Sequence, residues 1–329
     1  MGNFLNFYQH IPERIDPNIS LGIFDISWYS LMYLVGLGVV YALLRYRIRK
    51  GEFGGISNPP DSPNKIQNSK LQIPNKSQNQ KSEIRNEVQD KSKLLFTNYY
   101  LLNALQTFLL YSFVGLLIGA RIGYVLFYDL GFYLNNPLAI VSPYDSAGNF
   151  IGIYGMSYHG GLLGVAAGSL IFKKYYQIRL WQWADFVAPA IPAGYFFGRI
   201  GNFLNGELYG RITQKPWGMY FLNENSSVFS YLRHPSQLYE AFLEGVVLFV
   251  ILWILRNKVF FREKLSGVYF IGYALARFAA EFFREPDEQI GFVFFVFTMG
   301  QILSLAMLAL GTALLLKIPK KWYTWEKRA

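Results

Sequence analysis

Three arginines lie within or at the end of long apolar runs of this sequence: Arg121, Arg199 and Arg277. A cation at the centre of a bilayer costs roughly 2.5–3.5 kcal/mol on insertion scales. A chain that carries this cost three times is expected to use the charges. Because a guanidinium donates two parallel hydrogen bonds to phosphate and keeps its charge, we expect the arginines to hold an anionic group inside the membrane. Lipid phosphate is the most abundant candidate.

The last of these runs continues past Arg277 to Glu281 and Arg284. The spacing i, i+4, i+7 places the three side chains on one face of a helix. In a functional interpretation, Glu281 orients one arginine while the other keeps its donors for phosphate. In a structural interpretation, the charges form a neutralised pair inside a helix bundle. The sequence leaves both interpretations open.

A second polar group follows Arg199. Asn202 comes three residues later, so the two side chains share a helical face if the helix persists. Asn205 and Glu207 follow, and glycines up to Gly210 permit turns and close approach of the backbone. A capped helix end explains one or two of these residues but not the whole set. We therefore expect a hydrogen-bonding group where the chain leaves the membrane.

The third apolar run contains His159, which is followed by Gly160 and Gly161. Gly160, Gly164 and Gly168 recur every four residues, a spacing that is typical of close helix packing in membranes. An imidazole titrates near neutrality, so a histidine inside a membrane is a natural general base. The alternative is a core histidine with a satisfied structural partner. Both interpretations of His159 stay open.

Three further positions are candidates for the same site. Tyr29 follows Trp28 at the start of the first apolar run, where by default it belongs to an interfacial aromatic belt. His234 precedes the fifth run, where Ser236 is suited to begin a helix, and a contribution of His234 to the site is secondary. Arg121 either pairs with a buried carboxylate or provides a second phosphate contact.

The elements that position these residues are expected to be membrane-spanning helices. Of the 329 residues, 52% are hydrophobic, more than in an average soluble domain. A spanning helix needs about 20 largely apolar residues. Seven runs fit, near 28–44, 105–128, 152–172, 181–200, 238–255, 267–285 and 292–316. We predict an all-α polytopic membrane protein that forms a single integral membrane domain over residues 1–329, with no cleavable signal peptide.

Charge patterning predicts the orientation of the spans. Lysines and arginines gather after the first, third, fifth and seventh runs, so the N-terminus is expected outside and the C-terminus in the cytoplasm. The net charge of +10 is then mostly a topology signal, and nucleic-acid binding is the weaker interpretation. The polar segment 54–93 favours a disordered cytoplasmic insertion. Residues 201–237 are expected to form a small external head.

The sequence contains no cysteine and only three histidines, which are far apart. Disulfides, thiolate nucleophiles and cysteine-ligated metals are therefore excluded. We expect a site without a metal and without any other cofactor. If the reaction involves a thiol, that thiol belongs to a substrate.

Several motifs resemble those of the bacterial phosphatidylglycerol–prolipoprotein diacylglyceryl transferase family. The stretch from Gly198 to Gly210 resembles the family signature and is highly specific. His-Gly-Gly at 159–161, His-Pro-Ser-Gln-Leu-Tyr-Glu at 234–240 and the charged stretch 277–287 are similar as well, in the same order. The resemblance covers nearly the whole chain apart from the insertion near 54–93.

The resemblance implies transfer of the diacylglyceryl group of phosphatidylglycerol to the lipobox cysteine of a prolipoprotein. A thioether forms and glycerol-1-phosphate leaves on the outer side of the bacterial cytoplasmic (inner) membrane. The implied partners are phosphatidylglycerol and the prolipoprotein signal peptide. Together with the patterns above, this gives as candidate catalytic residues His159, Arg199, Glu207, Arg277 and Glu281. The candidate substrate-binding residues are Tyr29, Arg121, Gly160, Gly161, Asn202, Asn205, Gly210, His234 and Arg284.

Three other functions remain alternatives. A transporter of an anionic solute would use the same arginines at mid-membrane, but the sequence shows no repeat and its polar motifs gather toward the external half. An intramembrane serine protease would use Ser157 near His159, but the sequence has no Gly-x-Ser-x-Gly motif. A lipid-binding scaffold would keep the arginines without needing His159.

Overall fold

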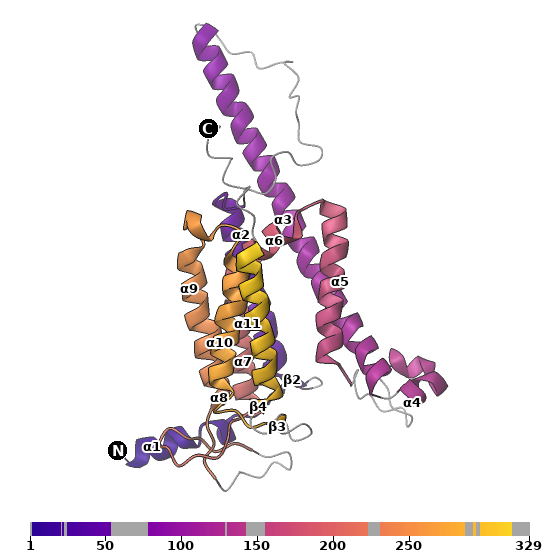
Figure 1. Ribbon diagram of the computed structural model, residues 1–329, viewed down its shortest axis with the longest axis vertical. Coiled ribbons are helices and arrows are strands. Elements are labelled where there is room, and N and C mark those ends of the chain that lie inside the picture. The colour runs from indigo at the N-terminus through magenta and orange to yellow at the C-terminus, as the bar shows by residue number, and fades with distance from the viewer. Residues whose placement is uncertain are drawn as a thin grey trace. The chain divides into compact units, whose positions relative to one another are not determined.

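The computed structural model describes residues 2–20, 22, 25–53, 78–128, 130–142, 155–222, 231–286, 292–293 and 297–317. Helices dominate these residues, and the chain divides into two compact units (Figure 1). The first unit combines Met1–Leu44 with Ala184–Ala329, and the second is Arg45–Trp183.

Four helices within the described residues are long and apolar enough to cross a membrane. They are α2 (Trp28–Arg49), the Asp90–Phe127 part of α3 (Gln78–Phe127), the continuous stretch Ser236–Leu255, and Met299–Leu316 of α11 (Met299–Lys317). A shorter apolar helix is α10 (Leu265–Ala280). The predicted all-α membrane character is therefore confirmed. The number of seven spans stays a prediction.

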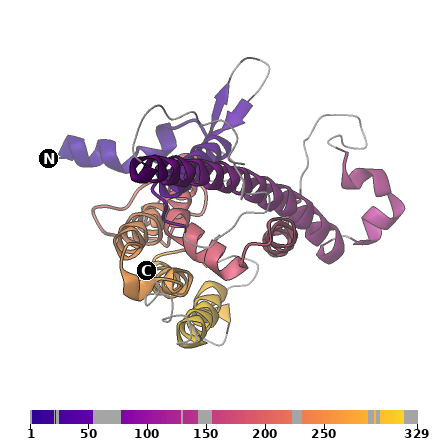
Figure 2. The same cartoon turned by 90° about the horizontal axis from the view of Figure 1, so that it is seen from above.

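The first unit is a helix bundle in which α9 (Leu248–Leu255), α10 and α11 run side by side (Figures 1 and 2). Glycines allow close packing within it. A Cβ on Gly36 of α2 would lie 2.9 Å from the carbonyl oxygen of Gly194 in α7 (Ile191–Leu204). A Cβ on Gly311 of α11 would lie 3.0 Å from the carbonyl oxygen of Gly267 in α10. Small residues at such crossings are the usual basis of helix association in membranes.

The stretch Ser236–Leu255 is not a uniform helix. It begins as α8 (Ser236–Glu240), continues as a π-helical segment, η4 (Ala241–Val247), and ends as α9. A π turn changes which side chains share a face and is frequent at functional sites. Here it follows Glu240 directly and contains Glu244.

Shorter elements complete the first unit. At the N-terminal end of the chain are α1 (Gly2–Gln9), η1 (Pro12–Arg14) and a hairpin of β1 (Asn18–Ser20) with β2 (Asp25–Ser27). A second antiparallel pair joins β3 (Phe292–Val293) to β4 (Phe297–Thr298), just before α11. Two short 3-10 turns connect longer helices. η3 (Ala188–Ala190) joins α6 (Leu180–Val187) to α7, and η5 (Val259–Phe261) lies between α9 and α10. The boundary between the two units falls within α6, after Trp183.

The segment 201–237 contains no helix between α7 and α8 among its described residues, 205–222 and 231–235. Isolated bridges join Ile212 and Met219 to Arg233. A small core of Phe203, Met219 and Phe221 packs against Tyr8. That this segment is an external head stays a prediction.

The second unit is built around the crossing of α3 and α5 (Tyr158–Tyr176). A Cβ on Gly164 would collide with the carbonyl of Gly115, and one on Gly160 would collide with the carbonyl of Gly119. These pairings run in opposite directions along the two helices, so α3 and α5 are antiparallel. The four-residue glycine spacing thus does pack helices, as predicted. The arm α4 (Leu130–Asn135) and η2 (Pro137–Ile140) follows α3.

The segment 54–93 is expected from its composition to be disordered. Residues 54–77 lie outside the described residues, and residues 78–93 are helical because α3 begins at Gln78. An i, i+4 ion pair of 2.6 Å joins Lys91 to Glu87 on this part of the helix. Such pairs, together with continuation into an apolar span, favour a helix where composition alone suggests none.

Candidate functional site

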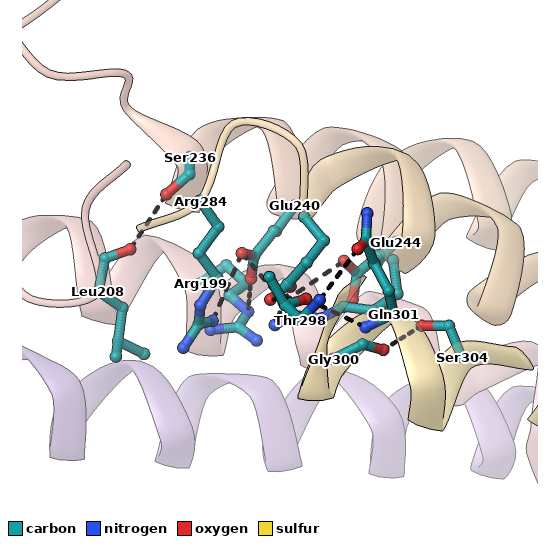
Figure 3. A network of polar contacts seen from close by, with 12 residues as sticks. Arg199, Leu208, Ser236, Glu240, Glu244, Arg284, Thr298, Gly300, Gln301 and Ser304 are labelled. Atoms are coloured by element: carbon teal, nitrogen blue, oxygen red, sulfur yellow. Dashed lines mark hydrogen bonds and ion pairs between the residues drawn. The ribbon is translucent and has the colours of Figure 1, made fainter. Parts of the chain in front are cut away.

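The first unit contains a buried cluster of three arginines and three glutamates (Figure 3). We call this set the arginine cluster. Its members come from α7, α8, η4 and α10 with the turn that follows it, namely Arg199, Glu240, Glu244, Arg277, Glu281 and Arg284. The arginine side chains are 12–14% exposed, and Glu244 is wholly buried. Contacts between the arginines and acidic side chains explain how such a set is tolerated inside a bundle.

Glu240 is the shared partner of all three arginines. Its Oε2 lies 2.8 Å from Arg199 Nε. Its Oε1 lies 3.0 Å from Arg277 Nη1 and 3.6 Å from Arg284 Nη1. The side chain is only 1% exposed, and Figure 3 shows it beside Arg199 and Arg284. One carboxylate therefore draws together cations from two different helices and the turn after α10.

Arg277 and Glu281 form the second part of the cluster. Their closest approach is 2.7 Å, between Arg277 Nη2 and Glu281 Oε2, as the i, i+4 spacing predicts. Arg277 Nη1 also lies 4.0 Å from Glu244. Glu281 accepts a hydrogen bond of 3.0 Å from Thr298 Oγ1. The pair is thus neutralised, as the structural interpretation expects, and Glu281 also holds Arg277 in place. The use of these arginines to bind phosphate stays a prediction.

The start of α11 supports Glu281 from the other side. The backbone N–H of Thr298 donates to Gln301 Oε1 at 3.1 Å, and the N–H of Gln301 donates to Thr298 Oγ1 at 3.3 Å. This reciprocal pattern is a capping box. A Cβ on Gly300 would lie 2.7 Å from the Glu281 carboxylate, so α11 packs directly against it.

The signature segment continues from Arg199 as a chain of hydrogen bonds. Arg199 Nη1 donates to Asn202 Oδ1 at 3.2 Å, and Asn202 Nδ2 donates to Glu207 Oε1 at 2.9 Å. Arg199 Nε donates to the Tyr195 hydroxyl at 2.7 Å. The shared face predicted for Arg199 and Asn202 is confirmed. Two of the predicted catalytic residues, Arg199 and Glu207, are thus linked through Asn202.

The predicted candidates Tyr29 and Asn205 meet at the end of α7. The backbone N–H of Tyr29 donates to Asn205 Oδ1 at 3.1 Å. A Cβ on Gly201 would lie 3.1 Å from the Cα of Tyr29, so the start of α2 approaches α7 closely. The signature segment therefore also fixes the first residues of α2.

Gly210 lies where the segment after α7 crosses the chain after α10. Its N–H donates to the carbonyl of His234 at 2.8 Å, and it forms a bridge with Arg284. A Cβ at this position would collide with the carbonyl of Phe283 and lie 2.7 Å from that of His234. Only glycine fits this crossing, which holds the backbone of Arg284 next to the cluster.

His234 lies at this crossing rather than in the cluster. Its Nδ1 is 3.1 Å from the Tyr239 hydroxyl, and its ring packs edge-on against Phe283. Burial lowers the pKa of His234 from its ordinary value, and the charge of Lys215 lowers it further. The imidazole is thereby favoured in its neutral form.

His159 and its neighbours belong to the second unit. His159 is the second residue of α5 and is exposed. Ser157 caps the helix, because its Oγ accepts a hydrogen bond from the N–H of Gly160 at 3.3 Å. Gly160 packs against Gly119, and a Cβ on Gly161 would lie 3.0 Å from Leu116. The candidate glycines therefore serve helix packing, and the pairing of His159 with the cluster stays a prediction.

Arg121 also belongs to the second unit and contacts backbone carbonyls. It donates from Nε to Ile140 and from Nη2 to Ala139, each at 2.7 Å, and from Nη1 to Gly155 at 3.2 Å. Its side chain is largely buried, and the ring of Tyr133 lies 5.1 Å from its Cζ.

Glu240 and Glu244 were not among the residues that the sequence indicated. The membrane cost of a buried charge, which singles out the arginines, applies to these two glutamates as well. Two acids at i, i+4 inside an apolar run must have partners in the membrane. In the part of the chain that the structure describes, no group of three or more histidines, aspartates and glutamates is arranged to hold a metal ion.

Comparisons with known proteins agree with the sequence motifs. The model of the prolipoprotein diacylglyceryl transferase family matches residues 88–317. A phosphatidylglycerol–prolipoprotein diacylglyceryl transferase of Chlorobaculum tepidum is 40% identical over 96% of this chain and 94% of its own. Proteins of the same name from Campylobacter lari and Wolinella succinogenes are 50% and 52% identical. The first match spans 93% of this chain and 95% of its own, and the second spans 62% and 72%.

Proposed function

This chain belongs to the prolipoprotein diacylglyceryl transferase family, and from that premise we propose its reaction. It transfers the diacylglyceryl group of phosphatidylglycerol to the thiol of the lipobox cysteine of a prolipoprotein. The sulfur forms a bond to the glycerol carbon, and the bond from that carbon to the phosphate oxygen breaks. The products are a thioether and glycerol-1-phosphate, and the step begins lipoprotein maturation. The observation that carries this proposal is the convergence of three largely buried arginines on Glu240.

Arg199 and Arg277 are proposed to stabilise the charge that develops on the departing phosphate. Preorganised donors in a low-dielectric site make the largest contribution to many reactions of this kind. Glu240 and Glu281 support this role because they hold both guanidinium groups before substrate arrives. Arg284 joins the same group through Glu240. Asn202, which accepts a hydrogen bond from Arg199, is proposed to donate to oxygens of the lipid headgroup.

His159 is proposed to remove the thiol proton. A free thiol has a pKa of about 8.5, so it needs a base or a positive field to react as the thiolate. A positioned imidazole contributes roughly 10²–10⁴-fold as a general base. The chain contains no cysteine, which agrees with direct transfer rather than a thiol-bound enzyme intermediate.

The remaining candidates are proposed to shape the substrate site. Glu207 and Asn205 extend the hydrogen-bonded chain of the signature segment toward Tyr29. Gly210 and His234 hold the crossing next to Arg284. The partners are phosphatidylglycerol and the signal peptide of the prolipoprotein, both of which reach the site through the bilayer.

The proposed setting is the bacterial cytoplasmic membrane. The protein crosses it seven times, with the N-terminus outside, the C-terminus in the cytoplasm and residues 201–237 as an external head. The whole chain acts as one integral membrane domain, with the site toward the external side. The distribution of basic residues among the loops supports this orientation.

Mass spectrometry of a synthetic lipobox peptide tests the reaction directly. The peptide is incubated with the purified protein and phosphatidylglycerol, and the same peptide with serine in place of cysteine serves as the control. A mass gain of one diacylglyceryl group on the cysteine peptide alone, with glycerol phosphate released, is the expected result. If folded protein and lipid give no adduct, the transferase proposal is overturned and transport of an anionic solute becomes the leading alternative.

A further inference from the structure

The guanidinium of Arg121 donates hydrogen bonds to backbone carbonyls of two separate chain segments. Ala139 and Ile140 lie at the end of η2, and Gly155 lies shortly before α5. The three hydrogen bonds, which we call the Arg121 clamp, therefore fix the arm after α3 and the approach to α5 to the same point of α3. All of these residues belong to the second unit.

The chemistry of the accepting groups favours a structural bond over a ligand site. The last carbonyls of a helical turn have no partner within the helix and carry partial negative charge. An arginine has five N–H donors, and here each of its three nitrogens already donates to a carbonyl. The arginine cluster is different, because its arginines contact the carboxylate of Glu240 and not only backbone carbonyls.

The clamp continues into the first turn of α5 through neighbouring contacts. The N–H of Ser157 donates to the carbonyl of Ala120 at 2.9 Å, one residue before Arg121. Ser157 then caps α5 at Gly160. The ring of Tyr124 packs so closely on Gly155 that a Cβ there would collide with it. One stretch of α3, residues 120–124, thus holds residues 155 and 157.

His159 follows two residues after this attachment. Its position on α5 is set at one end by the residues that Arg121 and Ala120 hold. It is set along the helix by the packing of Gly160 and Gly164 on α3. Loss of the guanidinium would remove the part of the first constraint that Arg121 supplies at Gly155. It would leave the hydrogen bond from Ser157 to Ala120 and the glycine packing in place.

We propose that Arg121 is a positioning residue that acts through the backbone at residues 139–140 and 155 to fix the first turn of α5, rather than a contact for the lipid headgroup. This rests on the proposed function, in which His159 at that turn accepts the thiol proton. Removing the clamp lowers the rate of the chemical step because the imidazole is less well placed. It leaves the binding of phosphatidylglycerol to the arginine cluster intact.

The test compares Arg121→Lys and Arg121→Gln with the unchanged protein in lipid nanodiscs. Lysine keeps the charge but lacks the planar fork that reaches three carbonyls. Hydrogen–deuterium exchange of peptides covering residues 155–161 is expected to become about tenfold faster or more in both variants. In the transfer assay, kcat is expected to fall at least about tenfold while KM for phosphatidylglycerol stays within about twofold.

Two further variants keep the test decisive. Lys174→Gln removes an exposed cation from the other end of α5 and is expected to change neither exchange at 155–161 nor kcat. Tyr133→Leu removes the ring beside the guanidinium and is expected to give a smaller increase in exchange at the same peptides, even if Arg121 variants do not fold.

Three outcomes would overturn the inference. One is a raised KM with unchanged exchange and partial rescue by lysine, which would make Arg121 a headgroup contact. Another is no change in exchange or in kcat. The third outcome is unchanged hydrogen–deuterium exchange at residues 155–161 in Tyr133→Leu, which decides the test if the Arg121 variants do not fold. Exchange is measured without substrate, so failure of the unchanged protein to transfer lipid would count against the proposed function and not against the clamp.

Discussion

At the scale of single residues, the arginine cluster depends on one carboxylate. Glu240 contacts Arg199, Arg277 and Arg284, and its side chain is almost wholly buried. Removing one member of a buried ion pair leaves an uncompensated charge in a region that cannot solvate it. The cluster therefore has a structural role and a proposed catalytic role that separate variants can distinguish.

Glu240→Gln is expected to destabilise the protein by about 3–5 kcal/mol, the usual cost of breaking a buried ion pair. Transfer should fall roughly hundredfold or more, because the arginines lose their shared anchor. Thermal unfolding and the transfer assay measure the two effects. The control is Glu285→Gln, which removes a 43% exposed partner of Arg233 and should cost less than about 1 kcal/mol. Similar losses in both variants would contradict the role given to Glu240.

His159→Gln is expected to lower transfer by roughly 10²–10⁴-fold while leaving the binding of phosphatidylglycerol nearly unchanged. Glutamine keeps hydrogen-bonding capacity but cannot accept the thiol proton at neutral pH. Lipid binding is measured by native mass spectrometry beside the transfer assay. Equal loss of binding and transfer would argue against His159 as the base.

His234 should make stability depend on pH. Its folded pKa lies below the ordinary value of 6.5 because of burial, with a smaller contribution from Lys215. Between that lowered pKa and about 6.5 the unfolded chain binds more protons, so stability falls as the pH falls through this window. Above it, His234 adds no pH dependence. Thermal unfolding across pH should show the decline, and His234→Asn should reduce its slope. An unchanged slope would refute the assignment.

At the scale of elements, two irregularities position the cluster. The π-helical segment after Glu240 interrupts the stretch Ser236–Leu255 where its acids face the arginines. The crossing at Gly210 joins the segment after α7 to the chain after α10. The π-helical segment changes which side chains share a face with Glu240. The crossing holds the backbone of Arg284 beside the cluster, which an unattached loop would not do.

Gly210→Ala is expected to destabilise the protein by about 1–3 kcal/mol, because the added methyl collides with the carbonyls of Phe283 and His234. Transfer should fall further than stability alone explains, since Arg284 moves with the crossing. The matched control is Gly38→Ala in α2, where an added Cβ meets no atom within 4 Å. That change should be neutral or stabilising by up to about 1 kcal/mol. Comparable transfer by the two variants, normalised to folded protein, would contradict the expectation.

At the scale of the whole molecule, the chain is a helical membrane protein whose described residues include four helices suited to span a bilayer. The proposed orientation rests on the distribution of basic residues. Because the chain has no cysteine, single cysteines can report on topology without background labelling.

Gln214→Cys, between α7 and α8, should react with a membrane-impermeant maleimide added to intact spheroplasts. Lys174→Cys, at the end of α5, should react only after the membrane is opened. Both side chains are exposed, so access rather than burial decides labelling. The reverse pattern would invert the proposed topology, and labelling of both from outside would remove a predicted span between them.

The sequence by itself determined the all-α membrane character, the family and most of the charged residues of the cluster, because hydropathy, charge and signature motifs are local properties. It also gave the shared face of Arg199 with Asn202, which three-residue spacing dictates. The helical start of α3 at 78–93 differs from the expected disorder, because composition does not register continuation into an apolar helix. Helix ends and π turns are likewise set by neighbouring contacts.

Only the tertiary structure decided which side chains become partners. Glu240 lies about 40 residues from Arg199 and from Arg277 in the sequence, and no local pattern shows that one carboxylate joins them. The carbonyls that hold Arg121 come from segments that only folding brings together. The sequence shows which residues are charged, but the partner of a buried charge depends on which helices pack together. Because the membrane contains no water to solvate such a charge, the charge must find its partner in the protein.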